Sequence, residues 1–386
     1  MGGSDLRARR GIIRLAPIVA SMAGGATRRD NYAPYVAGRP FSKLLSGISC
    51  AVMAAIFSFG AGSPAAATIG AAHSRSGLVG VLVEPSKLGS SAGMKPVYRF
   101  VLSARKTVDM TMYELVDPTM VKDLIADRKR GVRVRVILDT NRERSRNLPA
   151  FRALRAGGVA VVWAATGYEA THQKTITVDG AQSLVASFNL TDEYYTTTRD
   201  FGVWDTDRSD VSAIEAVFNA DFAHKSVKPS DGADLVWSPG SQTQMLAVIT
   251  GAKHSLSIEN EEMGDATITR AIVAAAKRGV RVEVTMTANG TYDRDFASIV
   301  EAGGHVHLYA NGWSDLYIHA KATIADAGLG TQRMYVGSIN FSSASMDDNR
   351  ELGIITTDAA IVKKVNTVVR SDFSNCDSAT DCKNYT

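Results

Sequence analysis

One short pattern occurs twice in this chain, and the two copies lie in matching stretches of sequence. Both copies have the form H-x-K-x4-D. Their defining residues are His172, Lys174 and Asp179 in the first copy and His319, Lys321 and Asp326 in the second. A single H-x-K triplet carries little information because it arises often by chance. Two copies at equivalent points indicate a duplication that brings two similar groups of side chains together.

The match between the two halves extends well beyond these motifs. The matched segments are 129–134 with 277–282, 156–159 with 302–305, 186–189 with 337–340, and 199–203 with 350–354. They occur in the same order in both halves, at a period of roughly 150 residues. This period is too long for a solenoid unit and suits a duplicated domain.

The paired motif resembles the signature of the phospholipase D superfamily, and the resemblance covers about 78–373. It implies an α/β fold in which two phospholipase D-like repeats, each a mixed β-sheet flanked by helices, pack as a pseudo-twofold pair. The site then lies at the interface between the repeats. We place the first repeat at 78–230, the second at 231–375, and a C-terminal tail at 376–386.

Alternating strands and helices are expected in each half. The first half predicts strands over 107–113, 132–138 and 159–163 and helices over 118–130 and 148–156. The second half predicts strands over 255–259 and 281–286 and helices over 267–277 and 296–302. Short strands over 175–178 and 322–325 follow the two histidines. Gly131 occupies a position where a helix C-terminus favours positive φ.

The two motifs together supply what cleavage of a phosphodiester requires, which is a nucleophile, a proton donor and positive charge around the phosphate oxygens. Residues i and i+2 of a strand point to the same side, so each histidine shares a face with its lysine. By analogy with two-repeat phospholipases D, we expect His172 to be the nucleophile and His319 the acid and base. The lysines provide the charge that a metal would otherwise bring, so we expect neither metal nor cofactor.

The resemblance assigns roles to further residues in the matching segments. Asn189 and Asn340, assisted by Ser187 and Ser338, are expected to bind the phosphate. Asp200 and Glu351 match the acid that orients a catalytic histidine through its other ring nitrogen. Asp179 and Asp326 are expected to be structural and to anchor the turn after each strand. For Glu259, Glu261, Glu262 and Glu114, the counterpart of Glu262, a position lining the cleft and a solvated or capping face both remain open.

Residues 1–67 lie outside the repeat and are typical of a secretory signal peptide. Arg39 and Lys43 precede an apolar run over 44–59, and Ala65-Ala66-Ala67 follows as a cleavage site. A retained membrane anchor is the alternative. The run is short for a membrane span, so we expect a secreted protein with no transmembrane segment in the mature chain.

Removal of this leader changes the charge of the protein. Residues 1–67 hold eight Lys/Arg and two Asp/Glu, whereas the whole chain has a net charge of +4, so the remaining residues carry −2. The basic character therefore belongs to the leader and does not indicate a nucleic-acid-binding surface. In an exported protein, Cys376 and Cys382 are expected to form a disulfide; two free thiols are the alternative.

Three substrate classes are compatible with these motifs. The first is a phospholipid head-group ester at a membrane or micelle surface, hydrolysed by a monomeric phospholipase D that can also transfer the phosphatidyl group to an alcohol. The second is a nonspecific nuclease, which the charge of the mature chain disfavours. The third is a phosphatidyltransferase of the cardiolipin synthase kind. Aromatic residues near the motifs either shape a pocket for a quaternary ammonium group or pack between the repeats.

Overall fold

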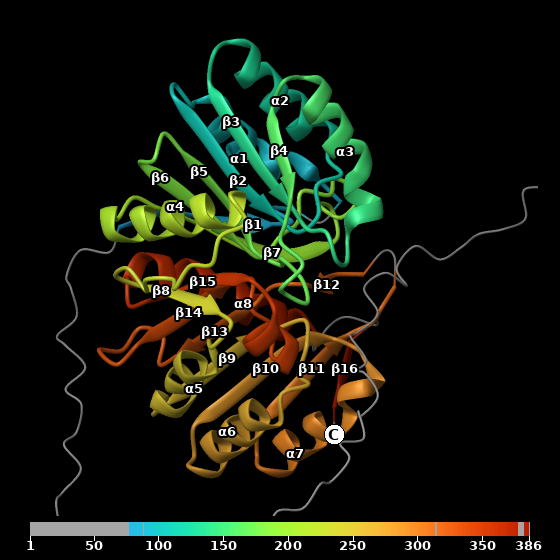
Figure 1. Cartoon of the computed structure of the whole chain (residues 1–386). Coiled ribbons are helices and arrows are strands. Elements are labelled where there is room, and N and C mark those ends of the chain that lie inside the picture. Colours follow the sequence, from blue (N-terminus) through green and yellow to red (C-terminus); the bar gives the residue numbers. More distant parts are fainter. Residues whose placement is uncertain (1–76, 88, 313–314, 377–381, 386) are drawn as a thin grey trace, which may run out of the picture. The chain divides into compact units, whose positions relative to one another are not determined.

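The computed structural model describes residues 77–87, 89–312, 315–376 and 382–385 (Figure 1). The expected leader, 1–67, lies outside these residues. Within them the chain forms two mixed sheets with helices packed against them, and each sheet is built from one of the two halves except for one short strand. The expected α/β fold with two repeats is confirmed.

The first sheet has the strand order β1-β7-β6-β5-β2-β3-β4. These strands are β1 (Leu78–Glu84), β2 (Thr107–Met112), β3 (Arg133–Leu138), β4 (Ala160–Trp163), β5 (Lys174–Val178), β6 (Gln182–Ala186) and β7 (Thr198–Asp205). Strands β2, β3 and β4 are parallel, and β5, β6, β7 and β1 continue the sheet in antiparallel fashion. The parallel part is the βαβ portion that the alternating pattern predicts.

The second sheet repeats this plan in the order β16-β11-β10-β9-β13-β14-β15-β8. Its strands are β8 (Leu235–Ser238), β9 (Ser255–Glu259), β10 (Arg281–Thr287), β11 (His305–Tyr309), β13 (Ala322–Ala325), β14 (Arg333–Gly337), β15 (Glu351–Thr356) and β16 (Cys382–Asn384). One short strand, β12 (Tyr317–Ile318), comes from the second half but pairs in parallel with β7 of the first sheet. The two halves are therefore joined by main-chain hydrogen bonds.

Helices pack on both sheets. They are α1 (Lys95–Leu102), α2 (Pro118–Lys129), α3 (Arg144–Ala156), α4 (Arg208–Phe222), α5 (Gln242–Gly251), α6 (Ala266–Lys277), α7 (Asp293–Glu301) and α8 (Ala359–Cys376). Short 3₁₀ turns at Ser91–Met94 and Gly290–Tyr292 and a π turn at Ala344–Asp348 complete the described elements. In Figure 1, α4 and α8 lie in the layer between the two sheets.

Local sequence accounts for where the helices begin and end. Asp117 and Asp265 cap α2 and α6 at equivalent points by accepting backbone N–H groups of the first turn. After α2, Gly131 has φ of +97°, as its position predicts. Helix α3 begins at Arg144, one turn before the predicted start, because the buried side chain of Asn147 bonds the backbone at Leu115 and Tyr113 and fixes that turn.

A hydrophobic core joins the two repeats. It combines Phe201 and Val203 of β7 with Leu352 and Ile354 of β15, and it includes the apolar faces of α4 and α8. Two other cores lie within the individual halves, one under α1 to α3 and one under α5 to α7. The interface is thus a packed apolar layer, which holds the ends of β7 and β15 in fixed relation.

Candidate active site

The two H-x-K segments lie at the interface, at equivalent places in the two sheets. Lys174 is the first residue of β5 and His172 lies just before that strand, whereas His319 and Lys321 lie in the link from β12 to β13. All four side chains are buried, with exposed fractions between 0 and 9% of each residue. The structure therefore brings together the four residues predicted to carry the chemistry.

Each H-x-K segment is held by the backbone of the opposite repeat. The amides of His172 and Gln173 both donate to the carbonyl of Arg350, at 2.9 Å in each case. In the other half, the amide of His319 donates to the carbonyl of Arg199 at 3.2 Å. The positions of both histidines consequently depend on the docking of the two repeats.

The orienting acids are exchanged between the repeats. Nδ1 of His172 lies 2.8 Å from Oε2 of Glu351, and Nδ1 of His319 lies 2.7 Å from Oδ1 of Asp200. Asp200 and Glu351 were expected to orient a histidine, and the structure pairs each with the histidine of the other half. A carboxylate at Nδ1 holds the proton there, which leaves Nε2 of the ring for chemistry at the phosphate.

The same exchange is found in a second pair of contacts. Nε of Arg350 lies 3.0 Å from Oδ2 of Asp221 on α4, and Arg199 binds Asp372 on α8 with two nitrogen atoms, at 2.5 and 3.0 Å. Each arginine directly precedes an orienting acid and pairs with a helix of the opposite repeat. Four charged contacts therefore cross the interface in a pseudo-symmetric arrangement.

We call the region around His172 and Lys174 the first half-site and the region around His319 and Lys321 the second half-site. Burial governs the electrostatics of the first half-site. Burial lowers the pKa of His172, and Lys174 and Lys321 add to this, although Glu351 opposes it. Burial likewise lowers the pKa of Lys174 to about 7. For Glu351 burial alone would raise the pKa, but His172 and Lys174 outweigh it and hold the pKa below its usual value. A neutral His172 beside an ionised Glu351 follows from these shifts.

Tyr113 forms the wall of this half-site. Its ring makes an edge contact with the ring of His172, with centroids 4.6 Å apart, and Nζ of Lys174 lies 4.7 Å from its centroid. Nζ of Lys174 also donates to the carbonyl of His172 at 2.6 Å. The ammonium group of Lys174 thus faces an aromatic ring where Lys321 faces a carboxylate.

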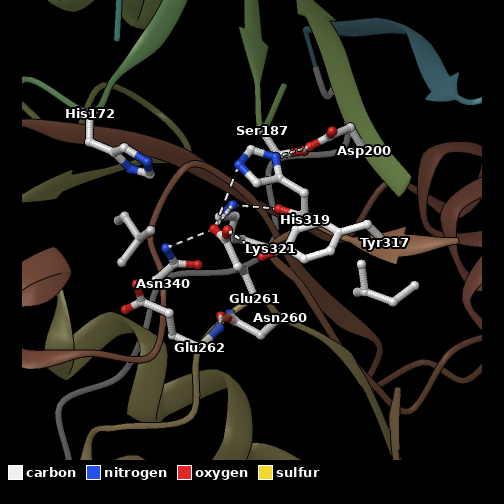
Figure 2. A network of polar contacts seen from close by, with 12 residues as sticks. His172, Ser187, Asp200, Asn260, Glu261, Glu262, Tyr317, His319, Lys321 and Asn340 are labelled. Atoms are coloured by element: carbon white, nitrogen blue, oxygen red, sulfur yellow. Dashed lines mark hydrogen bonds and ion pairs between the residues drawn. The ribbon is translucent and has the colours of Figure 1, made fainter. Parts of the chain in front are cut away.

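That carboxylate is Glu261, which the sequence left undecided between a cleft and a solvated face. Its Oε2 accepts from Nζ of Lys321 at 2.9 Å and from Nδ2 of Asn340 at 3.3 Å, and lies 3.6 Å from Nε2 of His319. Its Oε1 accepts the hydroxyl of Tyr317 at 3.1 Å. Figure 2 shows Lys321, Asn340 and His319 converging on Glu261.

Tyr113 and Glu261 are equivalent positions of the two repeats. Leu115 and Met263 make matching bridges to the residues that follow Asn189 and Asn340. Tyr113 lies two residues before Leu115, and Glu261 lies two residues before Met263, so Tyr113 and Glu261 occupy equivalent positions in the two repeats. The predicted equivalence of Glu114 and Glu262 already contained this pairing, so the difference between the two half-sites was readable in the sequence.

Asn189 and Asn340 are both buried beside the site, on the loops after β6 and β14. The two serines of the same loops, Ser187 and Ser338, form hydrogen bonds within the protein. Ser187 donates to Oδ1 of Asp200 at 2.6 Å and accepts the amide of Phe201, and Ser338 exchanges hydrogen bonds with the backbone of Leu352. Both serines are fully buried, and these contacts support the neighbouring strand and acid; their assistance in phosphate binding stays a prediction.

The motif aspartates lie on the far end of the same strands. Asp179 accepts the amides of Arg105, Lys106 and Thr107, at distances between 2.6 and 3.1 Å. Asp326 accepts the three equivalent amides at 253–255. Both residues have positive φ, so each carboxylate joins the turn after its strand to the start of the neighbouring strand.

Two further acids, Glu259 and Glu262, lie at the end of β9; Glu259 is buried and Glu262 is half-buried. Burial raises the pKa of Glu262 to about 7, and the charge of Glu261 adds to the rise. Burial also raises the pKa of Glu259 well above its usual value, and Asp372 adds to the rise. Glu114, the counterpart of Glu262, instead pairs with Arg146 on α3. Glu259 is fully buried and Glu261 faces the site, whereas Glu262 is half-buried, so the solvated face left open by the sequence does not apply to Glu259 or Glu261.

Three further expectations concern a disulfide in the C-terminal tail, membrane-spanning segments and metal binding. Cys376 at the end of α8 is disulfide-bonded, and the side chain of its expected partner, Cys382, lies outside the described residues. Within the described part of the chain, no helix is long and apolar enough to span a bilayer. In the same residues no cluster of three or more His, Cys, Asp or Glu is arranged to hold a metal ion.

Chemically, the arrangement offers two buried imidazoles, each with Nδ1 held by a carboxylate, and two buried ammonium groups. A neutral His172 is suited to attack phosphorus. Nδ1 of His319 contacts Asp200, which orients the ring, so that the other ring nitrogen can give a proton to a leaving group. These are the requirements for cleavage of a phosphodiester through a phosphohistidine.

Comparison with known proteins places this site in a family. The family model described as "Cardiolipin synthase, PLD-like domain" matches residues 97–222 and 245–373, one segment in each repeat. Major cardiolipin synthase ClsA of Bacillus subtilis (strain 168) is 27% identical over 297 residues, which cover 65% of this chain and 59% of that protein. Cardiolipin synthase A of Pseudomonas entomophila (strain L48) is 24% identical over 330 residues, with coverage of 74% and 67%.

Solved structures agree at the level of the fold. Phosphatidylserine synthase from Haemophilus influenzae Rd KW20 superimposes with a TM-score of 0.58 at 13% identity, covering 78% of this chain and 87% of that chain. Polyphosphate kinase from Porphyromonas gingivalis gives a TM-score of 0.57 at 13% identity, with coverage of 76% and 50%. The chain spans about three fifths (59%) of the length of the Bacillus relative.

Proposed function

The chain belongs to the phospholipase D superfamily, with two domains of the cardiolipin synthase, PLD-like type, and on this premise we propose that it is a phosphatidyltransferase. It takes a phosphatidyl group from a phospholipid donor onto His172 and passes it to the hydroxyl of an acceptor alcohol. The observation that carries the proposal is the crosswise orientation of two buried histidines by Glu351 and Asp200.

The first step forms the phosphohistidine. Nε2 of His172 attacks phosphorus, the bond from phosphorus to the head-group oxygen breaks, and His319 gives its Nε2 proton to that oxygen. The charge on the phosphate oxygens is met by Lys174, Lys321 and the two asparagine amides. Glu351 stabilises the positive charge that develops on His172 as its ring is phosphorylated.

The second step reverses the roles of the same groups. The acceptor hydroxyl loses its proton to the now neutral Nε2 of His319 and attacks phosphorus, and the bond from phosphorus to His172 breaks. Water in place of the alcohol would give hydrolysis, which was the first expectation from sequence. The names of the curated relatives favour transfer over hydrolysis.

The test uses purified protein and vesicles of phosphatidylglycerol, without added metal and with EDTA. Transfer of one phosphatidyl group to the glycerol head group of a second lipid yields cardiolipin and free glycerol. Hydrolysis yields phosphatidic acid and free glycerol. We expect cardiolipin as the main product by mass spectrometry. Phosphatidic acid alone would replace the transferase by a hydrolase, and cleavage of DNA without lipid turnover would refute both.

Single substitutions connect this activity to the site. His172→Ala and His319→Ala should each reduce the rate by several orders of magnitude, because neither histidine can fill both roles. His254→Ala, which removes an exposed imidazole away from the site, is the matched control and should leave the rate unchanged. A catalytic variant that keeps more than about a tenth of the wild-type rate would contradict the two-histidine mechanism.

A further inference from the structure

Glu261 occupies the place in the second half-site where the phosphate is needed. The groups that bind its Oε2 are Lys321 and Asn340, with Nε2 of His319 at 3.6 Å. These are a cation, an amide donor and the proton donor of the proposed reaction. A carboxylate oxygen and a phosphate oxygen accept hydrogen bonds from the same groups in the same way.

The first half-site has no such internal anion. Tyr113 stands at the equivalent position, and its ring lies beside Lys174 and His172. Nζ of Lys174 donates to the carbonyl of His172 and lies over this ring, whereas Nζ of Lys321 is bonded directly to a carboxylate. The duplicated motifs are chemically unequal because a carboxylate binds the lysine of the second half-site directly, whereas an aromatic ring stands at the equivalent position of the first.

Glu261 is held firmly in this position. Burial alone would raise its pKa, but Lys321 and His319 outweigh burial and hold the pKa well below its usual range. The carboxylate is therefore ionised at any pH at which the enzyme would work. Tyr317 donates to its other oxygen at 3.1 Å and restrains its rotation.

We propose that Glu261 is a displaceable internal ligand, a carboxylate that fills the phosphate position of the second half-site and must leave it when a phosphodiester binds. The inference rests on the phosphodiester chemistry proposed above. Substrate binding is then an exchange of one anion for another at Lys321 and Asn340. Small anions without a lipid body gain little from this exchange, whereas a phospholipid has further contacts with which to drive it.

The direct test is the affinity for inorganic phosphate, measured by calorimetry without any lipid. The experiment is done at about pH 6, where phosphate is mainly a monoanion, like a phosphodiester. Glu261→Gln keeps the shape of the side chain and removes its charge, so Lys321 becomes available. We expect phosphate to bind at least tenfold more tightly, which is about 1.4 kcal/mol.

Glu262→Gln is the matched control. It makes the same chemical change one residue away, and because the pKa of Glu262 is about 7, this carboxyl is mostly protonated at the pH of the test. Its phosphate affinity should change by less than about threefold, since the side chains of Lys321 and Asn340 bond Glu261 and a protonated Glu262 carries no charge to remove. An equal gain in both variants would mean that general charge, and not displacement, sets the affinity, and would overturn the proposal.

The outcome that refutes the proposal directly is an unchanged phosphate affinity in a folded Glu261→Gln variant. If that variant lacks a cooperative melting transition, Tyr317→Phe carries the same test, because it removes one hydrogen bond to Glu261 and leaves Lys321 and Asn340 intact. A gain of at least about threefold is then expected, and no gain refutes displacement. Phosphate binding is independent of lipid turnover, so failure of the proposed transferase activity is read separately from the vesicle assay.

Discussion

Replacement of Glu351 by Gln should inactivate His172 as a nucleophile, because it should stabilise the wrong tautomer of the imidazole ring. In the wild-type protein Oε2 of Glu351 accepts from Nδ1 of His172, and Oε1 accepts from Nδ2 of Asn349 at 3.0 Å. A glutamine has one oxygen, and Asn349 directs that oxygen to its own side. The amide NH2 then faces Nδ1 of His172 and moves the ring proton to Nε2, the atom that must attack phosphorus.

The expected loss of rate in Glu351→Gln follows from these contacts. Loss of one hydrogen bond to a charged group costs about 1.5–3 kcal/mol, which is roughly a 10- to 150-fold change in rate. A histidine held in the wrong tautomer loses on the order of 10⁴ in kcat in a hydrolase where the comparable substitution was made. Because Glu351 is fully buried and water cannot replace it, we expect a loss of about 10³–10⁴ for Glu351→Gln.

The assay separates the two histidines by the leaving group. Bis(p-nitrophenyl) phosphate releases p-nitrophenolate, which needs no proton, and the first turnover is followed by its colour. Glu351→Gln should remain severely slowed, because attack itself is blocked. Asp200→Asn, the matched change at His319, should lose much less in this first turnover, because the acid is not required.

Two results would refute this reasoning. A rate for Glu351→Gln within tenfold of the wild type would show that the contact does not set the state of His172. A first turnover more impaired in Asp200→Asn than in Glu351→Gln would exchange the roles of the two histidines.

Lys174 makes substrate binding depend on pH: burial lowers its pKa to about 7, so the KM for a phosphodiester should rise as the pH increases through about 7, and Lys174→Arg should abolish that rise. Asp221→Asn leaves the buried guanidinium of Arg350 without its carboxylate and should lower the free energy of unfolding, measured by urea denaturation, by about 2–3 kcal/mol. A decrease under about 0.5 kcal/mol would show that the pair does not hold the repeats together. Protein from culture medium should begin close to Thr68 and contain no free thiol, which N-terminal sequencing and thiol labelling would check; an intact N-terminus found only inside the cell would contradict the proposed secretion.

Much of the fold follows from local signals in the sequence. Helix α2 lies between the cap at Asp117 and the glycine at 131, and β9 has the predicted bounds, because capping, glycine and apolar periodicity act over a few residues. Strand β12 could not be predicted in this way. It has two residues, and its partner Thr198 lies more than a hundred residues earlier in the other repeat.

In the site, too, features set by local sequence were predictable and features set by docking of the two repeats were not. The duplicated motifs identify His172 and His319 because the residue types and their spacing carry the chemistry. The exchange of Glu351 and Asp200 between repeats depends on how two sheets dock, which a repeat within one chain does not specify. The role of Glu261 was missed for a different reason, since only a position-by-position comparison with Tyr113 shows that the two halves differ there.

The crosswise pairing of acids and histidines also sets when the protein can become active during its synthesis. His172 is separated from Glu351 by 179 residues, so a ribosome that has completed the whole first sheet has not yet made the acid that orients its histidine. The first repeat can bury its own core at that stage, yet its reactive imidazole has no fixed tautomer. Activity is withheld from the nascent chain until β15, one of the last strands of the second sheet, has been made and docked.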